Sequence, residues 1–173
     1  IIVRKSNLSG ILAACVFKAC ENNGVPRTLA EVGILLGIDK KDVNNGIKKL
    51  KKHTENPNMY DQPATNLINN HITKISSELN MNQEHIDFCL KVAKNYDKLR
   101  LSGDHGVEPI AGGIIYFVVD HLNLSISMNQ VCDCTSSSPM TIQKIFKELK
   151  NPYLSIALIN DDATDFIVKD ILK

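Results

Sequence analysis

Residues 28–32 (TLAEV) and residues 127–131 (SMNQV) share one pattern and begin 99 positions apart. In each stretch a hydroxyl residue stands before an apolar residue and three positions before Glu or Gln. This is the pattern of a capping box, in which the hydroxyl and the Glu or Gln side chain each accept a hydrogen bond from a backbone N–H group at a helix start. The two stretches therefore predict a helix start in each half of the chain.

The offset of 99 residues also relates apolar positions on both sides of these stretches. The pairs are Ile11 with Ile110, Val16 with Ile115, Phe17 with Tyr116, Leu29 with Met128, Val32 with Val131, Val43 with Ile142, Ile47 with Phe146 and Leu50 with Leu149. Unrelated amphipathic helices would drift in phase across the intervening loops, so a match over ~40 positions at one register indicates a duplicated helical unit.

Apolar residues recur every three or four positions elsewhere as well, and no stretch alternates like a strand, so the sequence predicts an all-helical chain. Helices are expected over residues 7–22, 28–36, 39–52, 64–79, 82–100, 109–122, 127–134, 139–150 and 162–172. The second copy has two helices ahead of its three matched helices, whereas the first has a short lead-in. Ile1 is not a natural start, so we expect the first copy to have lost about two N-terminal helices.

These patterns divide the chain into four segments. The expected segments are the C-terminal part of a first repeat at 1–53, a linker at 54–63, a complete second repeat at 64–150, and a helical tail at 151–173. The linker is rich in turn-forming residues such as Asn56, Pro57 and Pro63. Within the second repeat, Gly112 and Gly113 lie in a helical pattern, where we expect close packing against a neighbouring helix.

Composition predicts a soluble intracellular protein. The chain has 173 residues, of which 43% are hydrophobic and 23% are charged, and no apolar run approaches the ~20 residues that cross a bilayer. Residues 1–60 carry ten basic and five acidic residues, whereas residues 61–173 carry ten and fourteen. The front half thus either faces an acidic partner or presents a solvated basic face.

Neither a metal site nor an active site is predicted. The five cysteines are an odd number without a CxxC pair, so we expect reduced, buried side chains at Cys15, Cys20, Cys89, Cys132 and Cys134. The five histidines are scattered, and neither HExxH nor a phosphate-binding glycine loop occurs. The sequence therefore argues against an enzyme.

The run at 14–20 (ACVFKAC), the turn at 24–28 (GVPRT) and the stretch at 39–43 (DKKDV) resemble the first cyclin-like repeat of transcription factor IIB (TFIIB). Residues 64–150 resemble its second repeat more faintly, chiefly through Gly106, Pro109-Ile110, Ile115-Tyr116 and Met140-Thr141-Ile142. The resemblance implies an adaptor in the nucleus, or at the site of viral transcription if a virus encodes it. Its implied partners are a TATA-binding protein, promoter double-stranded DNA and RNA polymerase II. It implies a monomer and no cofactor in these residues, the zinc ribbon of the family being expected upstream.

Each copy ends in two short helices joined by a tight turn, the geometry of a helix-turn-helix. Pro139 can open the last helix of the second copy, so the positions expected to enter a major groove are Met140, Thr141, Gln143 and Lys144. By the resemblance, a basic lead-in near downstream DNA corresponds to Arg4, Lys5 and Ser6, and Lys40 and Lys41 correspond to a basic pair that meets acidic residues of the TATA-binding protein. Arg27 either fixes its turn or reaches that partner.

Two positions depart from the family pattern. Gln143 stands where the family has Arg, which replaces a preference for guanine with one for adenine. Glu108 adds a carboxylate where the family has Gly-Arg-Ser-Pro, so we expect the second repeat to hold DNA less firmly than usual. The basic run at Lys48, Lys49, Lys51 and Lys52 is interpreted as a solvated helix C-terminus, where cations suit the helix dipole.

Two alternatives share this architecture. A cyclin-type regulator would bind a kinase with the same five-helix unit, and fold alone cannot separate it from an initiation factor. The turn at 24–28, the Lys40-Lys41 pair and the 99-residue register favour the initiation factor. A related factor serving RNA polymerase III stays open as the second alternative.

Overall fold

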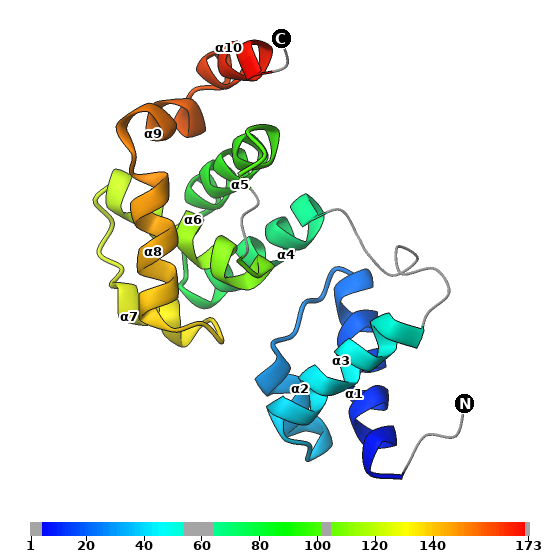
Figure 1. The fold of residues 1–173 in the computed structure, drawn as a ribbon. Coiled ribbons are helices and arrows are strands. Elements are labelled where there is room, and N and C mark those ends of the chain that lie inside the picture. Colours follow the sequence, from blue (N-terminus) through cyan, green and yellow to red (C-terminus); the bar gives the residue numbers. More distant parts are fainter. Residues whose placement is uncertain (1–4, 54–63, 102–104, 172–173) are drawn as a thin grey trace. The chain divides into compact units, whose positions relative to one another are not determined.

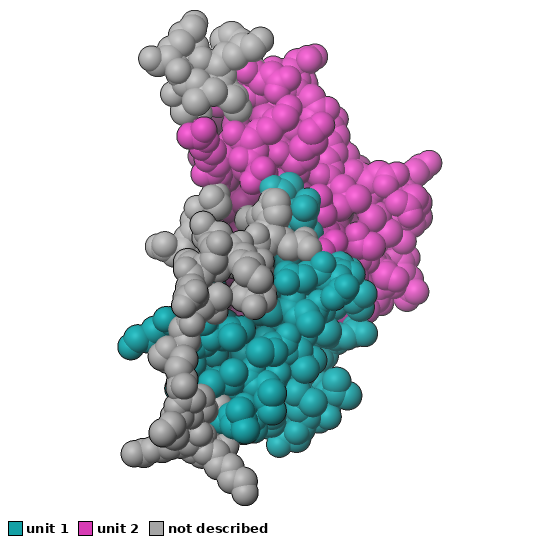
Figure 2. All heavy atoms as spheres, turned by 90° about the vertical axis from the view of Figure 1, so that its right-hand side faces the viewer, with its two compact units in different colours: residues 1–67 teal, residues 68–173 magenta. Residues whose placement is uncertain are grey.

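The computed structural model describes residues 5–53, 64–101 and 105–171, and every regular element in these ranges is a helix (Figure 1). The chain divides into two compact units, Ile1–Leu67 and Ile68–Lys173, coloured separately in Figure 2. The all-helical prediction is confirmed. The predicted linker at 54–63 lies outside the described residues.

The first unit contains three helices, α1 (Lys5–Asn22), α2 (Leu29–Leu36) and α3 (Lys40–His53). Thr28 caps α2 as predicted, since its Oγ1 accepts from the backbone N of Glu31 at 3.1 Å and the Glu31 carboxylate accepts from the backbone N of Thr28 at 2.5 Å. The helices enclose a small core of Ala13, Val32 and Val43, with Val16, Phe17, Leu29 and Ile38 partly buried around it.

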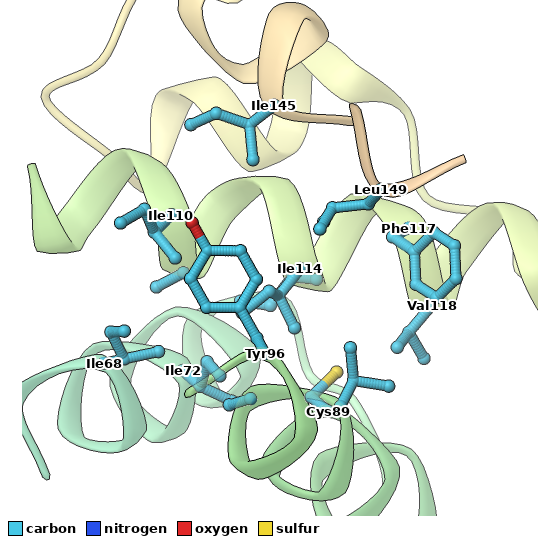
Figure 3. Packing of buried hydrophobic residues seen from close by; sticks show 14 of the residues in the cluster. Ile68, Ile72, Cys89, Tyr96, Ile110, Ile114, Phe117, Val118, Ile145 and Leu149 are labelled. Atoms are coloured by element: carbon cyan, nitrogen blue, oxygen red, sulfur yellow. The ribbon is translucent and has the colours of Figure 1, made fainter. Parts of the chain in front are cut away.

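The second unit contains most of α4 (Ala64–Glu78), then α5 (Gln83–Lys98), α6 (Val107–His121), α7 (Met128–Asp133), α8 (Pro139–Leu149), α9 (Pro152–Ile159) and α10 (Asp161–Ile171). Its core is much larger, and α6 runs through the middle (Figure 3). Side chains of α4 and α5, including Ile72 and Cys89, lie on one side of α6, and Ile145 and Leu149 of α8 lie on the other.

The predicted register is visible in the folded units. Ser127 caps α7 with a second capping box, in which its Oγ accepts from the backbone N of Gln130 at 3.3 Å. The paired positions Val32 and Val131 are both buried, and so are Val43 and Ile142. These two matched pairs therefore point inward in both units.

Glycines set the closest helix contacts, although differently in the two copies. In the second unit, a Cβ on Gly113 would overlap the side chain of Ile145, so α6 and α8 pack closely there, as predicted for the glycine pair. In the first unit, a Cβ on Gly46 of α3 would overlap the backbone carbonyl of Gly10 in α1. Ile145 stands 99 residues after Gly46, so the copies reach a close helix crossing by different means.

The expectation that all five cysteines are buried is wrong for Cys15, which is exposed, and Cys20 and Cys134 are only partly buried. The residue that stands 99 positions after Cys15 is Ile114 of α6, which is fully buried. Leu12 of α1 is likewise 56% exposed, whereas its counterpart Ala111 is fully buried. This face of α1 is thus open where the matching face of α6 is covered.

The tail holds two helices, of which only α10 was predicted. Helix α9 begins at Pro152 after Asn151, whose Oδ1 accepts from the backbone N of Tyr153 at 3.1 Å. The tail packs on α5 through Asn95, whose Nδ2 donates to the carbonyl of Leu158 at 3.1 Å and to Asp161 Oδ1 at 3.0 Å. A buried polar side chain far away in sequence thus anchors the tail.

Candidate nucleic-acid and partner interface

The second unit presents the start of α8 after a short turn from α7. Ser138 is the N-cap residue, with its Oγ accepting from the backbone N of Thr141 at 3.3 Å, and Pro139 occupies the first turn. The opposite face of α8 is held in the core by Ile142 and Ile145. The helix start is therefore held in place with Met140, Gln143 and Lys144 exposed, which is what a helix-turn-helix reader needs.

The four side chains predicted to enter a major groove lie together on this exposed start. Met140 is 79% exposed, Gln143 and Lys144 are exposed, and Thr141 is partly buried. They line one surface groove, which comprises His105, Ser138, Met140, Thr141, Gln143, Lys144 and Lys147.

Besides the capping residue Ser138, sequence reasoning missed two residues of this groove. Lys147 lies one helical turn beyond Lys144, so helical spacing alone could have found it. His105 precedes α6, and only the packing of α6 against α8 brings it to the groove. No local sequence signal points to His105.

Glu108 has an internal partner that the sequence did not reveal. Its Oε1 accepts from the backbone N of Ser136 at 2.9 Å, in the turn between α7 and α8. The carboxylate is partly buried and satisfies a backbone donor of the turn. Glu108 therefore supports the turn that presents α8.

The first unit presents α3 in the same way. Gly37 ends α2 with a φ of 64°, in the left-handed region that glycine adopts readily, and the backbone N of Lys41 donates to Asp39 Oδ1 at 2.8 Å. Lys40 and Lys41 are exposed at the start of α3, and Arg27 is exposed just before the capping residue of α2.

The predicted basic lead-in is only partly within the described part of the chain. Arg4 lies outside it, and Lys5 and Ser6 belong to the first turn of α1 without a described side-chain environment. Their proposed contact with DNA therefore stays a prediction.

The described part of the chain offers no group of three His, Cys, Asp or Glu side chains that could hold a metal ion. Burial raises the pKa of the Cys89 thiol to about 12 and also raises the pKa of the Cys132 and Cys134 thiols. A raised pKa keeps a thiol protonated, whereas a metal ligand must be a thiolate. None of the described helices is long and apolar enough to span a membrane.

Comparison with known proteins agrees with this geometry. Residues 4–53, which include α1, α2 and α3, match the transcription factor TFIIB repeat. Residues 4–53 therefore carry a TFIIB repeat. It is 34% identical, over 99% of its length, to a transcription initiation factor IIB-like protein of Acanthamoeba polyphaga mimivirus. It is also 24% identical to transcription initiation factor IIB of Encephalitozoon cuniculi over 95% of its length, and 22% identical to that of Archaeoglobus fulgidus over 86%.

The TFIIB resemblance seen in the sequence is thus confirmed. The alignments with the first two TFIIB relatives run through both units, although the repeat match itself covers only residues 4–53. The chain spans 38%, 52% and 44% of the length of these three relatives. All three carry the name of an initiation factor IIB, whose family is non-enzymatic, in agreement with the absence of catalytic motifs in the sequence.

Proposed function

We propose that the chain is the core of a general transcription initiation factor, which binds a TATA-binding protein and the flanking promoter DNA and helps recruit RNA polymerase II. One observation carries this proposal. The exposed start of α8, with Met140, Gln143 and Lys144 in one groove, occurs in a chain that aligns along almost its whole length with a TFIIB-like protein. Residues 1–53 and 64–150 serve as its two repeats.

The DNA contacts follow from the chemistry of the α8 groove. The Gln143 amide can donate and accept on an adenine edge, and the Met140 side chain suits the methyl group of thymine. Lys144 and Thr141 suit phosphate oxygens, which position the helix without reading sequence. Arg4, Lys5 and Ser6 supply further phosphate contacts at the other end of the chain.

Arg27, Lys40 and Lys41 are the residues proposed to meet acidic side chains of the TATA-binding protein. Both lysines lie in the first turn of α3, where a cation opposes the helix dipole. Their position therefore does not serve the stability of the helix. All three side chains are exposed and free to reach a partner.

The location and assembly follow from the same proposal. The protein acts as a monomer that joins a ternary complex in the nucleus, or at the site of viral transcription if a virus encodes it. The mimivirus relative supports the second setting. The proposal includes no cofactor.

A gel shift tests the proposal. The chain is mixed with TATA-box DNA with and without a TATA-binding protein from a matched source, at two salt concentrations. We expect a supershift that requires the TATA-binding protein and fades with salt, because exposed charges are screened. Lys40→Glu with Lys41→Glu should weaken it. Lys91→Glu with Lys94→Glu on α5 makes the same change of charge and should not, although it also removes the ion pair of Lys91 with Asp161 at 3.6 Å.

The opposite outcomes are equally informative. Full retention of the supershift by the variant at positions 40 and 41 would remove these lysines from the interface. A chain that gives no supershift but retains a kinase in a pulldown would instead be a cyclin-type regulator.

A further inference from the structure

Ser138 and Pro139 form the one Ser-Pro or Thr-Pro pair in the sequence. The other five prolines follow Val25, Asn56, Gln62, Glu108 and Asn151. Kinases of the proline-directed class transfer phosphate to a serine or threonine that stands directly before proline. The sequence therefore offers an enzyme of this class a single target.

The structure leaves this target accessible. Ser138 and Pro139 are both exposed, at the end of the turn that joins α7 to α8. The backbone of Ser138 is extended, with φ −73° and ψ 148°, and residues 134–138 belong to no helix. A kinase holds its target serine in an extended segment, so only the first turn of α8 has to open for Ser138 to enter. Helix ends open at little cost in free energy.

The corresponding helix start of the first unit already carries a negative charge. Asp39 stands 99 residues before Ser138 and directly precedes α3, as Ser138 precedes α8. In both places the backbone carbonyl accepts from the backbone N of the third and fourth residues that follow, at distances between 2.8 and 3.2 Å. Asp39 is exposed and its Oδ1 accepts from the backbone N of Lys41 at 2.8 Å. An anion therefore fits this backbone geometry, and it also suits the helix dipole.

Ser138 lies in a basic groove. It lines the α8 groove together with Lys144, Lys147 and His105, and the described lining of this groove holds no carboxylate. A phosphoserine carries a charge of about −1.5 to −2 at neutral pH, which would cancel most of the charge of the two lysines. A DNA phosphate that approached the groove would then meet a second phosphate instead of free cations.

We propose that Ser138 is a phosphorylation site for a proline-directed kinase, and that its phosphate weakens the binding of DNA in the α8 groove. In the transfer, the Ser138 Oγ forms a bond to the γ-phosphorus of ATP while the bond from that phosphorus to the β–γ bridging oxygen breaks, and ADP leaves. The hydroxyl proton passes to the catalytic aspartate of the kinase. The modification site is independent of the proposed function, whereas its effect on DNA rests on that function.

Incubation of the chain with a mitogen-activated protein kinase and Mg-ATP tests the site, with peptide mass spectrometry as the readout. We expect one phosphate per chain, on Ser138. Pro139→Ala should abolish its incorporation, because the proline that directs the kinase is lost while alanine suits the first turn of a helix. Ser137→Ala is the matched control and should leave incorporation unchanged, since Ser137 precedes no proline.

Fluorescence anisotropy of a labelled TATA-box duplex bound to a TATA-binding protein tests the effect on DNA, over a series of salt concentrations. Ser138→Asp and Ser138→Asn form the matched pair, because both residues cap a helix well and they differ by one negative charge. Each cancelled lysine contact lowers the slope of log affinity against log salt by about 0.9. The aspartate variant should therefore bind about eightfold more weakly than the asparagine variant at ~0.1 M salt, and the phosphorylated chain should lose about twice as much slope.

The two halves of the proposal have separate contrary results. Absence of phosphate on Ser138, or equal incorporation by the Pro139→Ala variant, would overturn the modification site. Equal slopes for the aspartate and asparagine variants, with matching thermal unfolding curves, would overturn the effect on DNA. A chain that takes up phosphate at Ser138 but binds the duplex in no form would contradict the proposed function and leave the site standing.

Discussion

Replacing Gly46 by alanine tests the close crossing of α1 and α3. A Cβ at this position would overlap the carbonyl oxygen and carbon of Gly10 and approach the backbone N of Ile11 at 3.0 Å. These are backbone atoms inside a helix, so no side-chain rotation relieves the overlap. The two helices must move apart, which loosens the packing of Val43 in the small core.

Two effects of opposite sign decide the size of the change. Alanine is favoured over glycine in a helix interior by about 0.8–1.0 kcal/mol. Overpacking a well-packed contact costs about 1–3 kcal/mol, and an overlap with backbone lies at the upper end of that range. We therefore expect Gly46→Ala to lower the free energy of unfolding of the first unit by about 2 kcal/mol.

Amide hydrogen exchange in α1 and α3 is the assay, because it reports on the first unit whatever the second unit does. Asn45→Ala is the matched control, since Asn45 is exposed on the same helix and gains helix propensity without an overlap. Protection should fall in the Gly46 variant and rise slightly in the control. A gain of about 1 kcal/mol in the Gly46 variant would show that propensity alone governs this position and would refute the close crossing.

Three further predictions concern the second unit and the thiols. Asn95→Ala should release the tail, because its two hydrogen bonds to Leu158 and Asp161 are lost at a cost of about 1–3 kcal/mol. Limited proteolysis should then cut within α9 or α10, while α6 stays protected. The pKa of Asp161 is lowered, first by the hydrogen bond from Asn95, so its contribution to tail docking is lost as the pH falls through that lowered pKa. The pKa of Lys98 is raised, first by its hydrogen bond to Asp165 of α10, so the contribution of Lys98 to tail docking is lost as the pH rises through that raised pKa. Amide hydrogen exchange in α10 should therefore be slowest between the lowered pKa of Asp161 and the raised pKa of Lys98. Cys15 should react first with a thiol reagent and Cys89 last, as read by mass spectrometry, because Cys15 is exposed and burial raises the pKa of Cys89 to about 12; equal rates at pH 8 would contradict the fold around α5.

Most of the helix starts could be predicted because they depend on nearby residues. Thr28 and Ser127 satisfy backbone donors three positions away, and Pro139 has its backbone angle preset for a first turn. The start of α9 was missed although it has comparable signals at Asn151 and Pro152. Helix α9 has just eight residues, too few for a clear apolar period.

The candidate site could be predicted only in part for the same reason. The exposed row on α8 follows from helical periodicity, which needs no knowledge of the rest of the fold. His105 reaches that row only because α6 packs on α8, and Glu108 supports the turn through a hydrogen bond across 28 positions to Ser136. Such contacts leave no periodic or local trace in the sequence.

The sequence by itself determined the helical class, because capping and apolar periodicity act over a few residues, and it revealed the TFIIB resemblance. The duplicated unit read from the 99-residue register stays a prediction. Only the tertiary structure decided which faces stay open. It exposed Cys15 on α1 while burying Ile114, the residue 99 positions later, and it brought Gly10 of α1 against Gly46 of α3. Burial and grooves arise from what packs against a helix, and that depends on residues far away along the chain.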